Sequence, residues 1–182
     1  KYPEPGKVYT ISVDVGRGDG GDESCIQVID AETMEQVAEY LGHMDTRELG
    51  RRCVSVATEY NNGILVIENK NIGWDTVQEA IDLEYKNLYY SPTKDMYIDP
   101  AKHIKKGYDL KENGDMTPGF TTDTKTRPMM LSSLEQYCRS KTIIIRSSRT
   151  WNQLSVFIWL NGKAQAQTGY HDDAIIALAI NI

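Results

Sequence analysis

The chain has 182 residues, of which 40% are hydrophobic and 25% are charged, and its formal net charge is -6. This length and composition predict one α/β domain with a single sizeable core, and the negative charge argues against a surface that binds nucleic acid everywhere. No signal peptide and no apolar run of ~18 residues is visible, so we expect a protein that is neither secreted nor membrane-spanning.

The first segment predicts an antiparallel meander of three strands. Residues 7–15 alternate between two faces, and Asp14 lies on the face that carries small polar side chains. The glycine-rich GRGDGGD that follows is typical of a turn into a second strand near residues 23–30. A third strand is predicted near residues 35–42.

A helix and a buried strand are predicted next. Asp45-Thr-Arg-Glu48 has the spacing of a capping box, and apolar residues then recur at helical spacing until Asn61-Asn62-Gly63. Residues 64–67 are apolar on both faces, as expected of a strand in the middle of a sheet. Glu68 ends this strand.

The middle of the chain is less regular. A second helix is predicted near residues 73–84 and a short strand near residues 86–90. Residues 91–123 contain prolines, glycines and several lysines, which predicts a long loop or a small insertion. Disorder is the alternative for this stretch.

The last third predicts a helix, a strand, a hairpin and a terminal helix. A helix is expected from Thr126 onward, followed by a buried strand at residues 142–146. Residues 151–168 hold two short elements around an Asn-Gly dipeptide, which is typical of hairpin turns. The final helix is expected to begin at Asp172 or Asp173.

Carboxylates occur where these elements end or begin. Asp14 closes the first strand, Glu68 closes the buried strand, and Asp172 and Asp173 open the last helix. A mixed sheet would bring them into one cleft, where carboxylates repel one another unless cations lie between them. The sequence therefore predicts two Mg²⁺ or Mn²⁺ ions and phosphodiester hydrolysis, with Asp22 folding back toward the same ions. Each acid taken alone is more often a turn residue or a helix cap.

Basic residues of the last third are candidates for phosphate contacts. Lys125 and Arg127 stand at a predicted helix start, which favours anionic ligands, and Lys163 belongs to the same basic group. His171 precedes the acid pair and is predicted either to relay protons or to bond only to the backbone. No element has the character of a groove-reading helix, so little sequence preference is expected.

Two groups of side chains are predicted to be structural. The aromatic residues near the hairpin are expected in the core rather than as base-stacking platforms: Trp151, Phe157 and Trp159. The cysteines are widely spaced and are expected to be buried small hydrophobes in a reducing compartment: Cys25, Cys53 and Cys138.

Four stretches together carry a family resemblance. ISVDVGRGDGGD, LVIENKNIG, PGFTTDTKTRP and TGYHDDAIIALAI resemble, in this order, the nuclease domain of the large terminase subunit from tailed bacteriophages. The resemblance implies a ribonuclease H-like α/β fold. Its central mixed sheet would have three antiparallel strands followed by parallel strands, with helices on both faces. Residues 1–182 would form a single nuclease domain with the insertion at about 91–123.

The resemblance also implies an activity and its residues. The activity is metal-dependent endonucleolytic cleavage of double-stranded viral DNA concatemers during genome packaging. Asp14, Glu68 and Asp173 match the catalytic and metal-binding acids, Asp172 matches a neighbour that orients or helps to bind metal, and Asp22 matches an acid of the glycine-rich turn.

Partners follow from the same resemblance. The start at Lys1 without a methionine agrees with an N-terminal ATPase motor domain of the same polypeptide that is absent from this chain. A portal protein and a small terminase subunit are the other expected partners, with the host cell cytoplasm during phage assembly as the place of action.

Two other functions remain open at this point. The chain could be half of a nucleotide-binding domain of the actin and sugar-kinase type, whose acids hold Mg-ATP beside a glycine-rich turn. It could also be a non-catalytic DNA-packaging docking module that retains the fold.

Overall fold

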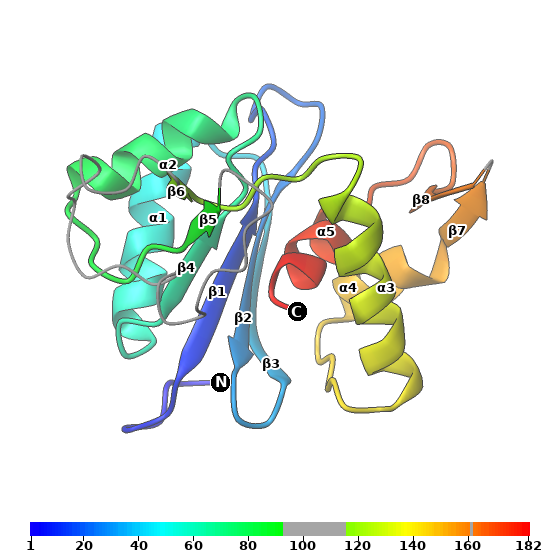
Figure 1. Cartoon of the computed structure of the whole chain (residues 1–182), viewed down its shortest axis with the longest axis horizontal. Helices are drawn as coiled ribbons and strands as arrows, with labels where there is room; N and C mark the ends of the chain where they lie inside the picture. The colour runs from blue at the N-terminus through cyan, green and yellow to red at the C-terminus, as the bar shows by residue number, and fades with distance from the viewer. Residues whose placement is uncertain (93–115, 161) are drawn as a thin grey trace.

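A four-stranded mixed sheet forms the centre of the computed structural model, which describes residues 1–92, 116–160 and 162–182 (Figure 1). The strand order is β3-β2-β1-β4, with β1 and β2 antiparallel, β2 and β3 antiparallel, and β1 and β4 parallel. The strands are β1 Tyr9–Asp14, β2 Ser24–Asp30, β3 Glu35–Gly42 and β4 Ile64–Ile67. The predicted meander and the predicted buried strand are confirmed.

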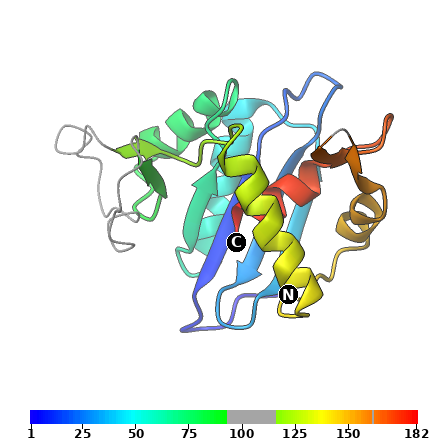
Figure 2. The same cartoon turned by 45° about the vertical axis from the view of Figure 1, so that its right-hand side comes forward.

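Helices cover both faces of this sheet, as predicted. Helices α1 Thr46–Glu59 and α2 Gly73–Asp82 pack on one face. On the other face lies α5 Asp173–Ile180, with α3 Thr126–Arg139 packed across its outer side (Figure 2). Every residue of α5 is buried, because the sheet and α3 enclose it.

The alternation of β1 assigns its residues to these two layers. Ile11 and Val13 belong to the apolar core beneath α1 and α2. Ser12 faces the opposite side, where its hydroxyl donates to the carbonyl of Ala177 in α5 at 2.5 Å and accepts from the Asn181 side chain at 2.6 Å. A strand of period two thus carries an apolar layer on one face and a polar anchor for α5 on the other.

Two expected strands are reduced to single bridges at the edges of the sheet. Leu88 makes one parallel bridge with Leu65, and the chain then pairs elsewhere as β5 Tyr90–Pro92 with β6 Met116–Pro118. The predicted strand near residues 86–90 is therefore wrong in its extent. Most of the predicted insertion, residues 93–115, lies outside the described residues.

The predicted strand at residues 142–146 is also wrong. Ile144 makes a single parallel bridge with Glu35. The following backbone donors, the N–H groups of Arg146 and Ser147, donate to the Gln36 side-chain oxygen at 2.7 Å. A side chain thus takes the donors that a longer strand ladder would use.

A short helix precedes the predicted hairpin. Helix α4, Ser148–Ser155, was not expected, and the Ser147 hydroxyl caps it by accepting from the N–H groups of Arg149 and Thr150. The hairpin of β7 Phe157–Leu160 and β8 Lys163–Ala166 is confirmed. The segment SRTWNQLS has too few apolar residues for hydrophobic periodicity to predict a helix.

The side chains predicted to be structural divide into two groups. Cys25 and Cys53 are buried as predicted. Trp151 is 54% exposed and Trp159 is 66% exposed, so the prediction that these indoles lie in the core is wrong. Both project from elements at the rim of the fold, where the sheet offers them no cover.

Among the described helices, none combines the length and hydropathy that a membrane crossing requires.

Helix α2 begins at Gly73, where the backbone of Glu68 leaves no room for a side chain. A Cβ atom there would lie 2.0 Å from the Glu68 carbonyl oxygen, which is backbone and cannot move aside. We therefore expect Gly73→Ala to lower the free energy of unfolding by about 1–3 kcal/mol in urea denaturation. Gly21→Ala is the control, because the nearest atom to its Cβ is 3.8 Å away in a side chain. Equal stability of the two variants would contradict this account.

Candidate metal centre

The candidate site lies where β1 and β4 end side by side. Their parallel pairing brings Val13 next to Ile67, so Asp14 and Glu68 follow at the same edge of the sheet. The N–H of Glu68 donates to the Val13 carbonyl at 2.9 Å, which continues the ladder to the residue that carries the carboxylate. Two acids far apart in the sequence thus become neighbours.

Helix α5 brings the third acid to the same place. Asp172 precedes the helix and Asp173 is its first residue. The Gln153 side chain accepts from the N–H of Ala174 at 2.8 Å, and Ser12 bonds to the carbonyl of Ala177. These bonds, together with burial of the whole helix, hold Asp173 opposite the strand ends.

A cleft of about 440 Å³ collects all five predicted metal-binding residues, and we call it the acidic cleft. Its acidic lining consists of Asp14, Asp22, Glu68, Asp172 and Asp173. Three cationic residues also line it: Arg17, Lys70 and Arg127. The sequence predicted Arg127, whereas Arg17 and Lys70 were missed, although Lys70 follows Glu68 by two residues at a strand end.

Two carboxyl groups of the acidic cleft, those of Asp14 and Asp173, have raised pKa values. Burial raises the pKa of Asp14 well above its usual range, and the negative charge and hydrogen bond of Glu68 raise it further, followed by the charges of Asp173 and Asp172. Burial also raises the pKa of Asp173 to about 6, which a nearby His171 partly opposes. The cleft therefore concentrates negative charge that cations would stabilise.

One carboxylate oxygen in the cleft lacks a hydrogen bond. Asp173 is 8% exposed, and its Oδ2 atom is buried without a hydrogen bond among the described residues. Ligand atoms of Asp22, His171 and Asp173 all lie within 4.8 Å of one another, and His171 Nδ1 is 3.5 Å from Asp173 Oδ2. A divalent cation fits this donor set, because two carboxylates and an imidazole are ordinary ligands of Mn²⁺ and related ions.

Asp172 has a different neighbourhood from Asp173. Its Oδ2 atom accepts from Arg127 Nη2 at 2.9 Å in a half-buried ion pair. Arg127 is the second residue of α3, which begins at Thr126 as predicted. The pair ties the start of α3 to the start of α5 and leaves Asp173 as the acid that faces the other carboxylates.

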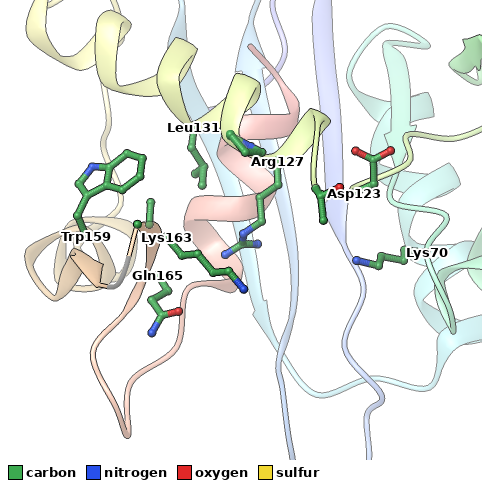
Figure 3. Close-up of a pocket in the computed structure, with 11 residues that line it drawn as sticks. Lys70, Asp123, Arg127, Leu131, Trp159, Lys163 and Gln165 are labelled. Carbon is green, nitrogen blue, oxygen red and sulfur yellow. The ribbon is translucent and has the colours of Figure 1, made fainter. Parts of the chain in front are cut away.

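A second hollow, of about 420 Å³, adjoins the acidic cleft between α3 and the β7–β8 hairpin, and we call it the basic groove. Its lining includes Lys70, Arg127, Trp159 and Lys163, and Figure 3 shows them across the groove with Arg127 between Lys163 and Lys70. Lys125 is exposed at the N-terminus of α3 and lines neither hollow. Of the three predicted phosphate contacts, two therefore border the groove.

Comparison with solved structures identifies the fold. The crystal structure of the large terminase nuclease from thermophilic phage G20c with bound magnesium is 15% identical and has a TM-score of 0.70, covering 99% of this chain and 82% of that one. The chain has the fold of a large-terminase nuclease domain. The ribonuclease H-like arrangement that the sequence predicted is thereby confirmed.

Two further terminase nuclease structures have the same fold as this chain. The large terminase nuclease domain of Thermus phage P74-26 is 17% identical with a TM-score of 0.65, covering 99% of this chain and 80% of that one. The human cytomegalovirus terminase nuclease domain, soaked with manganese and bound to an inhibitor, is 12% identical with a TM-score of 0.56, covering 96% and 81%. No protein-family model matches the sequence. At these identities the likeness establishes the fold.

The raised pKa of Asp173 predicts how stability without metal depends on pH. The folded state binds this proton more tightly than the unfolded chain, so the contribution of Asp173 to stability falls as pH rises from about 4 to about 6. We expect Asp173→Asn to gain stability relative to the wild type across this range, measured by urea unfolding in EDTA. A constant difference between the two proteins from pH 4 to 7 would contradict the burial of a charged Asp173.

Proposed function

We propose that this chain is a metal-dependent endonuclease that cleaves double-stranded viral DNA during genome packaging. The observation that carries the proposal is the convergence of Asp14, Glu68 and Asp173 in one cleft, where a buried Asp173 oxygen has no hydrogen bond among the described residues. Structures of the same fold contain magnesium or were soaked with manganese, which supports divalent cations as the cofactor. Residues 1–182 would form a single nuclease domain.

The acidic cleft suits two cations with shared ligands. Asp14, Glu68 and Asp173 would hold one ion, while Asp22, His171 and Asp173 would hold the other. Bound in this way, two divalent ions supply a water of lowered pKa and stabilise charge on the departing oxygen. The protein's own part is to hold the ligands rigidly, through two strand ends and a buried helix start.

The cationic residues around the acids would position the DNA. Arg127 and Lys70 lie at the border between the acidic cleft and the basic groove, and Lys163 lies further along the groove. Phosphates that approach the metal centre would therefore meet positive charge on one side, although the chain as a whole is acidic. These contacts reach the backbone of DNA and not the base edges, which supports weak sequence preference.

Two competing functions make different predictions. A nucleotide-binding half-domain would bind ATP tightly without cleaving DNA, and a docking module would bind packaging proteins without turnover. The basic groove beside the acids favours a polyanionic substrate that extends beyond the metal centre. An ATPase motor domain, a portal protein and a small terminase subunit would then determine where the cut is made.

Amide variants test the catalytic assignment. Asp14→Asn, Glu68→Gln and Asp173→Asn should each lower the rate of plasmid nicking in Mn²⁺ by at least about 100-fold, because each removes a charged metal ligand. Each variant should unfold in EDTA at a temperature no lower than the wild type, since the change removes mutual repulsion.

Asp19→Asn is the matched control for these variants. Asp19 is exposed in the glycine-rich turn that also carries Asp22, but it does not line the acidic cleft. Its amide variant should therefore nick plasmid at the wild-type rate. Near-normal nicking by any of the three cleft variants would remove that residue from the site.

Salt dependence tests the phosphate contact of Lys163. Lys163→Ala should reduce the slope of log affinity against log salt by about 0.9 for duplex DNA, measured by fluorescence anisotropy with Ca²⁺ in place of Mn²⁺. Lys141→Ala is the control, because Lys141 is exposed beyond the opposite end of α3, roughly 20 Å from Arg127. The phosphate role of Lys163 is refuted by equal slopes for its variant and the wild type.

A further inference from the structure

We propose that the basic groove binds an unpaired nucleotide of the DNA strand that crosses the metal centre, with its base stacked on Trp159. The inference rests on the proposed nuclease function and adds the kind of substrate: DNA with an unpaired nucleotide beside the scissile phosphate, such as a gap, a flap or a frayed end. Trp159, Lys163, Arg127 and Lys70 carry the argument (Figure 3).

The charge of the groove suits a nucleic-acid backbone. The side-chain ammonium groups of Lys70 and Lys163 make no hydrogen bond or ion pair within residues 1–92, 116–160 and 162–182, and both residues are exposed at the groove. The carboxylate in the lining, Asp123, is already engaged: its Oδ1 accepts from the N–H groups of Lys125 and Thr126 at 2.7 and 2.8 Å. Positive charge therefore exceeds negative charge among the residues that line the groove.

The groove continues the acidic cleft. Lys70 and Arg127 line both hollows, so the metal centre and the basic groove adjoin at these two side chains. A strand whose phosphate lies at the acids would place an adjoining nucleotide in the groove. The groove is therefore placed to contact the same strand that is cut.

Trp159 gives the groove an aromatic surface. Its side chain is 66% exposed on β7, and its indole N–H has no hydrogen-bond partner among the described residues. Beside it, Gly162 leaves space, because no heavy atom lies within 4 Å of the position of a Cβ atom. An exposed indole in a groove that lysines also line combines base stacking with backbone contacts, which is how proteins bind single strands without reading sequence.

This geometry discriminates against paired DNA. In an intact duplex each base is stacked between its neighbours and paired, so its face is not available to an indole at the side of the helix. An unpaired nucleotide exposes that face at little cost. The groove should therefore favour gapped or single-stranded DNA over a blunt duplex.

Binding measurements with the whole chain test this inference. The probes are a labelled single strand, a duplex with a short central gap and a blunt duplex, measured by anisotropy with Ca²⁺ in place of Mn²⁺. Trp159→Ala should weaken binding of the single strand and the gapped duplex by at least about fivefold and change blunt-duplex binding by less than about twofold. Trp159→Phe should retain most of the affinity, because phenylalanine also stacks.

Trp151→Ala is the matched control. Trp151 is 54% exposed on α4, but it does not line the groove, and its indole donates to the Ile145 carbonyl at 3.2 Å. Its variant should bind all three probes as the wild type does. Thermal denaturation must show that both tryptophan variants are folded. Equal loss of affinity for the two variants, or no loss for Trp159→Ala, would overturn the inference.

A direct readout separates stacking from general attraction. With 2-aminopurine at the gap, the wild type and Trp159→Phe should quench its fluorescence on binding, whereas Trp159→Ala should quench it much less. If the wild type fails to cleave DNA but this pattern holds, the nuclease proposal fails and groove binding remains. If cleavage occurs and the Trp159 variants bind like the wild type, the groove inference fails and the nuclease proposal remains.

Discussion

Burial of α5 against the sheet is the constraint on which the candidate site depends. The helix carries Asp173 toward Asp14 and Glu68, where three carboxylates repel one another in a partly buried cleft. Burying its four large apolar side chains, Ile175, Ile176, Leu178 and Ile180, contributes roughly 6–12 kcal/mol before the entropy of ordering is subtracted. Holding Asp173 charged in its buried position, where its pKa rises to about 6 mainly through desolvation, costs at most about 3 kcal/mol before solvent screening reduces it. The apolar contacts therefore hold the acids together without metal.

The hydrogen bonds around α5 fix the position of the helix, which hydrophobic burial alone does not define. Hydrophobic burial is not directional and would allow the helix to slide along its axis. Ser12, on the face of β1 that meets α5, bonds to Ala177 and Asn181, while Gln153 bonds to the helix start. These bonds come from two elements, β1 and α4, and fix how far Asp173 projects beyond the sheet.

Charge is divided between two adjoining hollows. The acids line one, and the exposed lysines line the other, with Lys70 and Arg127 at the border. This division resolves the conflict between an acidic chain and a polyanionic substrate. Cations would neutralise the acidic cleft, and a short row of basic side chains is enough to guide phosphates toward it. The Arg127–Asp172 ion pair keeps the border in place by joining the starts of α3 and α5.

The sequence by itself determined the meander, the buried strand β4, the two helices beside them and the start of α5. In these segments, periodicity, caps and glycines all indicate the same structure. It also named the five acids of the cleft, which lie at strand ends, at a helix start and, for Asp22, in the glycine-rich turn.

Only the tertiary structure decided the edges of the sheet and the environment of the hairpin. The expected strands at residues 86–90 and 142–146 became single bridges, since pairing depends on which edge is free and on side chains such as Gln36 that compete for backbone donors. The sequence likewise did not predict three features of the site: the exposure of Trp159, the ion pair of Arg127 with Asp172, and the position of Lys70 between the two hollows. Each depends on contacts between elements far apart in the chain, and the spacing of residues within one segment does not predict such contacts.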